Sequence, residues 1–266
     1  MNLQGLLLDV EGVLVADKRY HPVEGAVEFI HRVRRQGLPL RLISNNTTDA
    51  IPTLAEKLRK AGFDFQHHEI RTCTATAVNH LRRPDVQRCL VLGTDALRQI
   101  FTDAGFEVVD ESQVDAIVVG LDTDLHYERL CLACQAVVQS NASLIALHRN
   151  RVYTDAHGRT APSVGPIVCA IEYATQTQAQ VMGKPNAEIY QQALQEIGAA
   201  PETVVMVSDD PFSDLAGAKR LGIRTAFVLS GKYADRSVLG ALSPEEMPDM
   251  TIDRIGSFTD TQWLSM

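Results

Sequence analysis

Polar residues that can do phosphoryl-transfer chemistry follow four apolar segments of this sequence. Asp9 stands within LLLDVEGVLV, Ser44 follows LPLRLI, Lys184 follows AQVMG, and Asp209 follows TVVMVS. Two carboxylates from separate strands form a hard oxygen site of the kind that Mg²⁺ prefers. A lysine and a serine suit a phosphoryl group, whose transfer depends mainly on charge neutralisation and positioning. The four residues together therefore predict a magnesium-dependent phosphoryl-transfer site.

Asp9 is the candidate nucleophile, because a carboxylate can attack phosphorus and form an aspartyl phosphate. A carboxylate at the end of a buried run is costly unless a cation or hydrogen-bond donors compensate it. Glu11, two residues later, can protonate the leaving group and then activate water. The plainer interpretation of Asp9, a strand-end cap, leaves the matching positions of Lys184 and Asp209 unexplained.

Several further polar residues around these positions have both a structural and a functional interpretation. Ser44, Asn45 and Asn46 are small polar residues in a row, typical of a turn and equally able to hold a phosphate. Asp210 is expected to be exposed or to cap a helix, with contact to metal-bound water as the alternative. Asp214 can begin the following helix, where a carboxylate suits the dipole, or support the site.

The segments that position these residues alternate between strands and helices. Apolar runs predict strands, and apolar residues at helical spacing predict the helices between them. Pro185 is predicted to occupy the first helical position of its helix. Such alternation is typical of an α/β fold with a doubly wound parallel sheet, in which the carboxyl ends of the strands meet at one edge. Besides the run before Asp9, strands are predicted at 38–43, 88–92, 115–120, 144–148, 179–183, 203–207 and 223–229, and helices at 26–33, 51–61, 72–81, 97–104, 127–139, 165–174, 185–197 and 213–221.

The helical pattern breaks at Arg82-Arg83-Pro84-Asp85, where we place the exit from a first domain. Residues 83–161 form a smaller α/β module, and the turn-rich loop TDAHGRTAPSVGP leads back to the first domain. The predicted organisation is a core of residues 1–82 and 162–266 with an inserted cap of residues 83–161. Polar residues at strand ends of the cap are structural or face substrate: Asp122, Asp124, His148, Arg149 and Asn150.

Composition argues against several classes of binding partner, against a membrane location and against a disulfide framework. The net charge of -8 and the mean hydropathy of -0.06 describe a soluble globular chain and argue against binding nucleic acid or acidic membranes. No apolar run reaches transmembrane length, and no secretory signal is recognised, so we expect a cytoplasmic location without a membrane partner. Five cysteines, an odd number, argue against a disulfide framework; Cys131 and Cys134 are predicted to be buried thiols.

The order and content of DVEGVL, LISNNT, GKP and SDDPFSD resemble the four motifs of the haloacid dehalogenase superfamily. The inserted module is similar to the C2 cap of its type IIA members. The pattern most resembles the branch that contains phospholysine phosphohistidine inorganic pyrophosphate phosphatase. This resemblance implies a Rossmann-like core and a Mg²⁺-dependent phosphatase acting on a small phosphorylated substrate, with a possible homodimer through the cap.

The resemblance also implies roles for individual residues. Asp9 would be nucleophile and magnesium ligand, together with the backbone carbonyl of Glu11 and the carboxylate of Asp209. Asp214 would orient the metal-bound water or support Lys184.

A second set of residues would bind the phosphate and balance its charge. Ser44 would hold the phosphate together with the backbone of Asn45 and Asn46. Lys184 would balance the charges of nucleophile and phosphoryl group.

Three departures from the family pattern are present, and two of them, Glu11 and Ser208, leave an alternative open. Glu11 stands where the superfamily usually has Asp, and its extra methylene moves the carboxyl group by roughly 1 Å, a displacement that can reduce a rate on the order of 100-fold. Ser208 replaces a common Gly, and Val13 replaces a common Thr. The alternative is a catalytically impaired protein that binds phosphorylated ligands or partner proteins. A metal-free dehalogenase is disfavoured, because Asp209 has no purpose in that chemistry.

Overall fold

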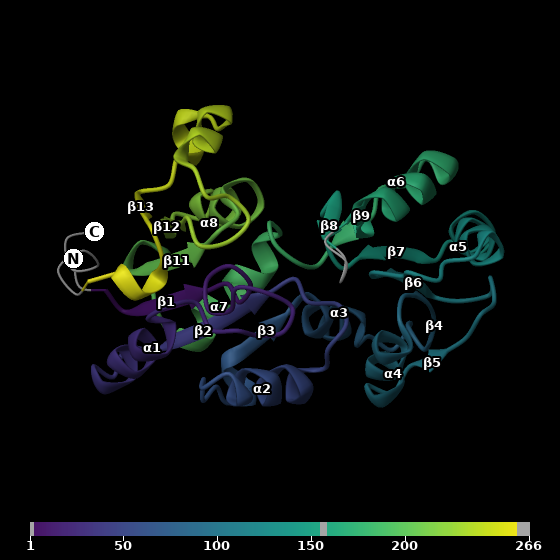
Figure 1. Cartoon of the computed structure of the whole chain (residues 1–266). Coiled ribbons are helices and arrows are strands. Elements are labelled where there is room, and N and C mark those ends of the chain that lie inside the picture. The colour runs from purple at the N-terminus through teal and green to yellow at the C-terminus, as the bar shows by residue number, and fades with distance from the viewer. Residues whose placement is uncertain (1–2, 155–158, 260–266) are drawn as a thin grey trace. The chain divides into compact units, whose positions relative to one another are not determined.

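The computed structural model describes residues 3–154 and 159–259, and its chain divides into two compact units (Figure 1). Part of the segment predicted as the loop back to the core, residues 155–158, lies outside the described residues. The first unit comprises Met1–Ser44, Ile51–Arg71 and Lys184–Met266, and the second comprises Asn45–Ala50 and Thr72–Gly183.

A six-stranded sheet forms the centre of the first unit, with the order β13-β12-β11-β1-β2-β3. β1 pairs in parallel with β11 on one side and with β2 on the other, so Asp9 leaves the sheet where the connections diverge in opposite directions. Ligands of open α/β sheets bind at such a switch point. The strands are β1 (Gly5–Leu8), β2 (Leu40–Ser44), β3 (Ile70–Thr72), β11 (Val204–Ser208), β12 (Arg224–Val228) and β13 (Met250–Ile252).

Helices cover both faces of this sheet because successive strand residues point to opposite sides. Leu6 and Leu8 pack in one buried cluster with α1 (Ala26–Arg35) and α2 (Ile51–Lys60). Leu7 packs in another with α7 (Ala187–Ile197) and α8 (Ala216–Lys219). The predicted doubly wound α/β fold is confirmed in this unit.

Two helix starts differ from the prediction. Pro185 is not the first helical residue, because Asn186 caps α7 by accepting a hydrogen bond from the backbone N–H of Glu188 at 2.8 Å. The helix predicted at 213–221 is instead a π-helical turn, Pro211–Leu215, followed by the short α8. The strands β3 and β13 were not predicted.

The second unit holds a five-stranded sheet of its own, with the order β10-β7-β6-β4-β5 and parallel pairing throughout. A two-stranded antiparallel hairpin occupies part of the segment predicted to be a loop. The elements are α3 (Cys73–Leu81), β4 (Arg88–Leu92), α4 (Asp95–Asp103), β5 (Glu107–Val108), β6 (Ala116–Val119), α5 (Tyr127–Ser140), β7 (Ser143–Ala146), β8 (Val152–Thr154), β9 (Thr160–Pro162), α6 (Val164–Thr175) and β10 (Gln180–Val181).

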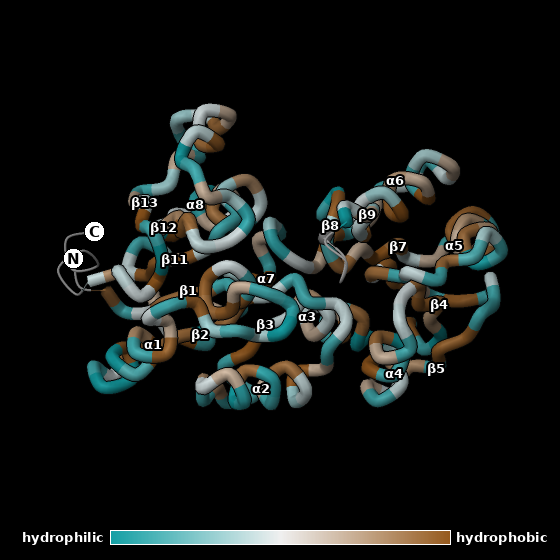
Figure 2. The backbone as a smooth tube through the Cα atoms, viewed as in Figure 1, coloured by the Kyte–Doolittle hydropathy of each residue, from teal (hydrophilic) through white to brown (hydrophobic). Residues whose placement is uncertain are grey.

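Packing places the unit boundaries at 71/72 and 183/184, outside the predicted 82/83 and 161/162. α3 packs with β4 in one buried cluster of the second unit, and α6 packs with β6 and β7 in another. The hydrophobic segments of these helices and strands are drawn brown in Figure 2. Local sequence pattern shows that α3 and α6 are helices but not which sheet they cover, so the predicted boundaries differ.

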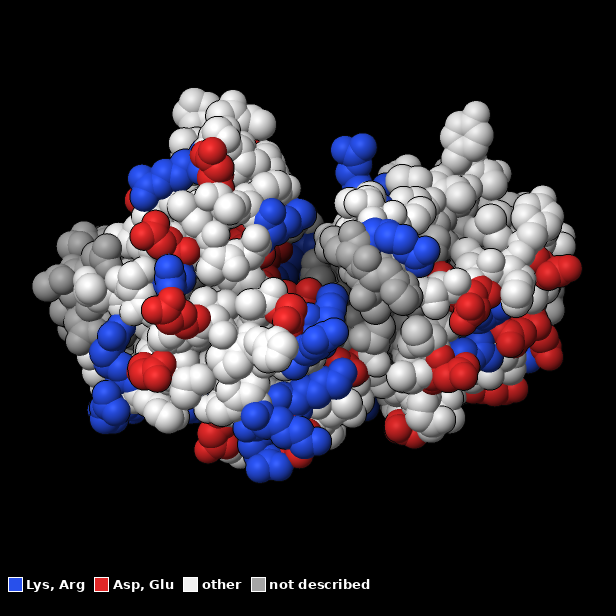
Figure 3. All heavy atoms as spheres, viewed as in Figure 1, with Lys and Arg blue, Asp and Glu red and all other residues white. Residues whose placement is uncertain are grey.

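The surface and the cysteines can be compared with what the composition led us to expect about membranes, charge and disulfides. No helix among the described residues is long and apolar enough to cross a membrane. On the face drawn in Figure 3, basic side chains gather over α2, whose last turn holds three, and acidic side chains gather around α4 and β5. None of the five cysteines forms a disulfide: Cys73 and Cys89 are buried, Cys131 and Cys134 are half-buried, and Cys169 is exposed. The CxxC thiols, which were predicted to be buried, are therefore only partly buried.

Candidate active site

A buried lysine joins two of the predicted carboxylates in the first unit. Lys184, only 2% exposed, donates hydrogen bonds from Nζ to Asp9 Oδ1 at 2.7 Å and to Asp214 Oδ2 at 2.6 Å. The backbone N–H of Asp9 bonds the carbonyl of Val207 at 3.0 Å, which continues the β1–β11 ladder and fixes the position of the carboxylate. Separate segments of the sequence thus supply one charge cluster at the carboxyl edge of the sheet.

Asp209 lies at the end of β11 between two glycines. A Cβ atom on either Gly12 or Gly231 would lie 2.0 Å from Asp209 Oδ2, closer than real Cβ contacts occur. The same oxygen accepts a hydrogen bond of 2.6 Å from the backbone N–H of Lys232. Asp209 therefore has one carboxylate oxygen enclosed by backbone, in a space that only glycines leave open.

The cluster holds more negative than positive charge. Burial raises the pKa of Asp9 to about 8, against the lowering effect of Lys184, and the charges of Asp214 and Asp209 raise it further. Burial also raises the pKa of Asp209 to about 6. Burial disfavours the charged form of Lys184, but the charges of Asp214 and Asp9 together raise its pKa above the ordinary value. One ammonium thus faces three carboxylates, an arrangement that favours a further cation.

This donor set fits a divalent cation that prefers oxygen ligands. The predicted ligand set consists of the side-chain oxygens of Asp9 and Asp209 and the backbone carbonyl of Glu11. Two backbone hydrogen bonds close the turn that holds Glu11, from Gly12 N to Val15 O at 2.7 Å and from Val15 N to Val10 O at 3.1 Å. Neither of them uses the Glu11 carbonyl. Among the described residues, no three His, Cys, Asp or Glu side chains form a metal cage. The predicted ligand set would not form such a cage, because it contains only two carboxylate side chains, those of Asp9 and Asp209.

Ser208, which departs from the family pattern, belongs to the same network. Its hydroxyl is fully buried, donates to Asp214 Oδ2 at 2.7 Å and accepts from the backbone N–H of Asp210 at 3.1 Å. Ser213 donates to the other oxygen of Asp214 at 2.8 Å, and Tyr190 donates to its backbone carbonyl at 2.8 Å. Asp214 is therefore held from several sides and in turn holds Lys184.

Asp210 has the capping position expected for it. Its Oδ1 accepts hydrogen bonds of 3.0 Å from the backbone N–H groups of Phe212 and Ser213 at the start of the π-helical turn. Its Oδ2 pairs with Lys232 Nζ at 2.7 Å. Burial opposes the charged form, but Lys232 lowers the pKa of Asp210 below its usual value.

The Glu11 carboxylate lies apart from the buried cluster. It pairs with the ammonium of Lys18, and the two side chains are 49% and 67% exposed. Sequence spacing alone placed this carboxylate beside the reacting groups. In the structure, an acid role for Glu11 requires that its side chain leave Lys18.

The three predicted phosphate-binding residues differ in surroundings. Ser44 ends β2 and is 6% exposed, at the same sheet edge as Asp9. Asn45 and Asn46 belong to the second unit. There the Asn46 side chain accepts hydrogen bonds from the backbone N–H groups of Thr48 and Asp49 at 2.9 and 2.8 Å, so it stabilises a turn.

The polar residues at strand ends of the second unit are largely engaged in structure. Asp122 accepts a hydrogen bond of 2.9 Å from Arg129 and one of 3.1 Å from the backbone N–H of Asp124. His148 accepts one of 3.2 Å from the backbone N–H of Asn150. These bonds fix the strand-end loops.

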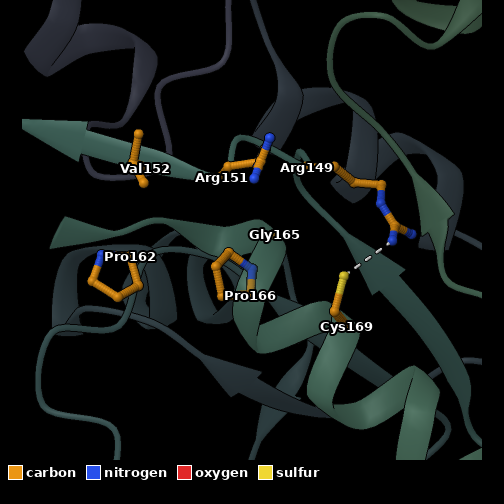
Figure 4. Close-up of a pocket in the computed structure, with 7 residues that line it drawn as sticks. All are labelled: Arg149, Arg151, Val152, Pro162, Gly165, Pro166 and Cys169. Atoms are coloured by element: carbon orange, nitrogen blue, oxygen red, sulfur yellow. Dashed lines mark hydrogen bonds between the residues drawn. The ribbon is translucent and has the colours of Figure 1, made fainter. Parts of the chain in front are cut away.

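A cavity of about 550 Å³ in the second unit is lined by Arg149 and by residues of the hairpin and of α6 (Figure 4). Arg149 donates two hydrogen bonds, of 2.6 and 2.8 Å, to Glu172, and a third of 3.4 Å to the sulfur of Cys169. Its guanidinium therefore holds α6, and a phosphate would have to compete with a two-point ion pair.

Five residues of the site were not identified from sequence: Gly12, Tyr190, Ser213, Gly231 and Lys232. The glycines and Lys232 lie in the short stretches DVEGVL and LSGKY, which follow the apolar residues of β1 and β12. That position at strand ends was the available signal. Nothing in the sequence around Tyr190 distinguishes it from an ordinary core residue.

Known proteins are similar to this chain over most of its length. Residues 6–107 match the model of the haloacid dehalogenase-like hydrolases, and residues 181–257 match a second model described as HAD-hydrolase-like. The chain is 35% identical to human haloacid dehalogenase-like hydrolase domain-containing protein 2 over 232 residues, which cover 87% of this chain and 86% of that one. It is 30% identical to phospholysine phosphohistidine inorganic pyrophosphate phosphatase of Xenopus laevis, covering 94% and 90%. Among solved structures, p-nitrophenyl phosphatase from Archaeoglobus fulgidus superimposes with a TM-score of 0.86 at 26% identity, covering 96% and 98%.

Proposed function

Because the chain belongs to the haloacid dehalogenase-like hydrolase family, we propose that it is a Mg²⁺-dependent phosphatase of small phosphorylated molecules that works through a phosphorylated Asp9. The observation that carries this proposal is the ion pair of Asp9 with Lys184, which is 2.7 Å long, joins a partly buried carboxylate to a buried ammonium and lies at the switch point of the sheet. The phosphatase names of two relatives support the substrate class.

In the first step, a carboxylate oxygen of Asp9 attacks phosphorus and the bond from phosphorus to the leaving group breaks. The proton that the leaving oxygen needs comes from Glu11 in its protonated form. Water then attacks the phosphorus of the aspartyl phosphate, and Glu11 takes a proton from that water. Inorganic phosphate leaves and the Asp9 carboxylate is restored.

Lys184 keeps Asp9 oriented for this attack. Asp214 fixes Lys184 by a second hydrogen bond, of 2.6 Å, and is itself held by Ser208. We expect Lys184 to balance the charges of the nucleophile and the phosphoryl group, and Ser44 to hold a phosphate oxygen. Asn45 and Asn46 remain proposed backbone donors to the same phosphate.

The side chains of Asp9 and Asp209 and the carbonyl of Glu11 would hold Mg²⁺. When bound, the cation neutralises the charge that develops on the phosphoryl oxygens. The excess of three carboxylates over one ammonium supports this assignment.

A second candidate function is binding of phosphorylated ligands without efficient turnover. The exposed pair of Glu11 with Lys18 favours this alternative, because it holds the proposed acid away from the buried cluster. Hydrolysis of a phosphoanhydride or phosphoamide bond depends less on a general acid. Turnover of such a bond therefore distinguishes a phosphatase from a protein that only binds phosphorylated ligands.

The test is hydrolysis of p-nitrophenyl phosphate and of pyrophosphate, each with Mg²⁺ and with EDTA. We expect Mg²⁺-dependent turnover by the wild type and none by Asp9→Asn, with Asp253→Asn, an exposed control, unaffected. Equal turnover by Asp9→Asn would refute the nucleophile. Binding of phosphate and Mg²⁺ without turnover of either compound would favour the binding function.

A homodimer through the second unit is proposed as well. Large apolar side chains on α5 and α6 support it, since Tyr127, Val138 and Tyr173 are 79%, 68% and 84% exposed. Light scattering should give twice the chain mass for the wild type and the chain mass for Tyr173→Lys. A monomeric wild type would refute it.

A further inference from the structure

We propose that the segment Ser230–Tyr233 is a clamp that positions Asp209 for cation binding, with Lys232 and Ser230 as its positioning residues. The segment follows β12 and the proposed reaction does not otherwise use it. The inference rests on the proposed function, because Asp209 is a proposed Mg²⁺ ligand.

The first contact of the clamp is with Asp209 itself. The backbone N–H of Lys232 donates to Asp209 Oδ2 at 2.6 Å, and Gly231 lies against the same oxygen. The opposite wall is Gly12, since a Cβ on Gly231 would lie 2.6 Å from the Gly12 Cα. The clamp therefore fixes one oxygen of Asp209, so that the orientation of the other is determined.

The Lys232 side chain ties the clamp to the residue after Asp209. Its Nζ pairs with Asp210 Oδ2 at 2.7 Å and lies 5.3 Å from the centre of the Tyr233 ring. Tyr233 in turn meets Phe212 edge-on, with ring centroids 5.9 Å apart. These contacts hold the backbone of the segment in place, and with it the N–H that binds Asp209.

Ser230 ties the clamp to the loop of the nucleophile. Its hydroxyl donates to the carbonyl of Gly12 at 2.6 Å, one residue after the Glu11 carbonyl that is the proposed backbone ligand. The clamp thus bonds both loops that supply metal ligands and sets their separation. Groups that orient metal ligands in this way affect affinity even though they do not touch the metal.

The experiment measures Mg²⁺ binding directly by calorimetry, without substrate, for wild type, Lys232→Met, Lys232→Arg and Ser230→Ala. We expect Lys232→Met and Ser230→Ala to weaken Mg²⁺ binding by about 10- to 100-fold, the usual effect of losing an outer partner of a metal ligand. Lys232→Arg keeps the ion pair with Asp210 and should retain most of the affinity. Lys219→Met removes a comparable lysine–aspartate pair elsewhere in the unit and should bind as wild type does.

Urea midpoints measured without Mg²⁺ separate positioning from general destabilisation. Weakened binding with an unchanged midpoint supports the clamp. If Lys232→Met and Ser230→Ala both bind Mg²⁺ as tightly as a wild type that binds and hydrolyses, the clamp is wrong and the proposed function stands. If the wild type binds no Mg²⁺, the clamp and the proposed cation both fall, whereas binding without hydrolysis overturns only the phosphatase.

Discussion

Three glycine-to-alanine substitutions separate the space that Asp209 needs from the backbone strain that glycine avoids. Gly37 has a φ of +67° and nothing within 4 Å of an added Cβ. Gly231 has no such φ but contacts Asp209, and Gly12 has both a φ of +76° and the contact. Alanine at these positions therefore tests strain alone, space alone, and the two together.

The expected magnitudes follow from the geometry. A Cβ on Gly231 would lie 2.0 Å from Asp209 Oδ2, and real Cβ contacts do not come under 3.0 Å, so the two groups must separate by about 1 Å. Misplacement on that scale reduces a rate on the order of 100-fold. A left-handed backbone conformation costs an alanine about 1 kcal/mol.

We expect Gly37→Ala to lose about 1 kcal/mol of unfolding free energy with unchanged activity. Gly231→Ala should lose activity by about 100-fold and need more Mg²⁺ for half-maximal rate. Gly12→Ala should share this loss and be less stable than Gly231→Ala by about 1 kcal/mol. The assays are Mg²⁺ titrations of p-nitrophenyl phosphate hydrolysis and urea unfolding.

Wild-type activity and Mg²⁺ dependence in a folded Gly231→Ala protein would refute the reasoning, because the enclosed carboxylate would then be free to move without consequence. An activity loss in Gly37→Ala would also contradict it, since that substitution touches no group of the site.

Three further predictions concern other parts of the chain. Glu11→Gln should slow hydrolysis of an alkyl phosphate such as glycerol phosphate by about 100-fold but p-nitrophenyl phosphate much less, because nitrophenolate leaves without a proton; equal effects on both would exclude an acid role. The hydrogen bond from Arg149 lowers the pKa of Glu172, against the effect of burial, so its stabilisation is present above the ordinary carboxyl pKa and is lost as pH falls through the lowered value. The melting temperatures of wild type and Glu172→Gln should therefore converge in acid, and a constant difference would contradict this. Tyr190→Phe should lower the unfolding free energy by about 1 kcal/mol, because the buried carbonyl of Asp214 loses its donor, and an unchanged urea midpoint would show that the bond contributes nothing.

The sequence by itself determined most of the elements and the polar residues that follow several of the strands. The helix of Ala26, Phe29, Ile30 and Val33 forms as its spacing predicts, and all four side chains are buried. A strand before Asp9 was also predictable, because both signals are local: apolar periodicity and the polar residue that ends a buried run.

Only the tertiary structure decided which of the polar residues meet. Lys184 lies 175 positions from Asp9, and their contact depends on how the strands are ordered, which no local pattern encodes. Glu11 stands two positions from Asp9 in sequence, but its carboxylate pairs with Lys18, a contact that the spacing of the residues does not encode. The assignment of α3 and α6 to the second sheet is of the same kind, since an apolar helix face can pack on any apolar surface that the chain brings to it.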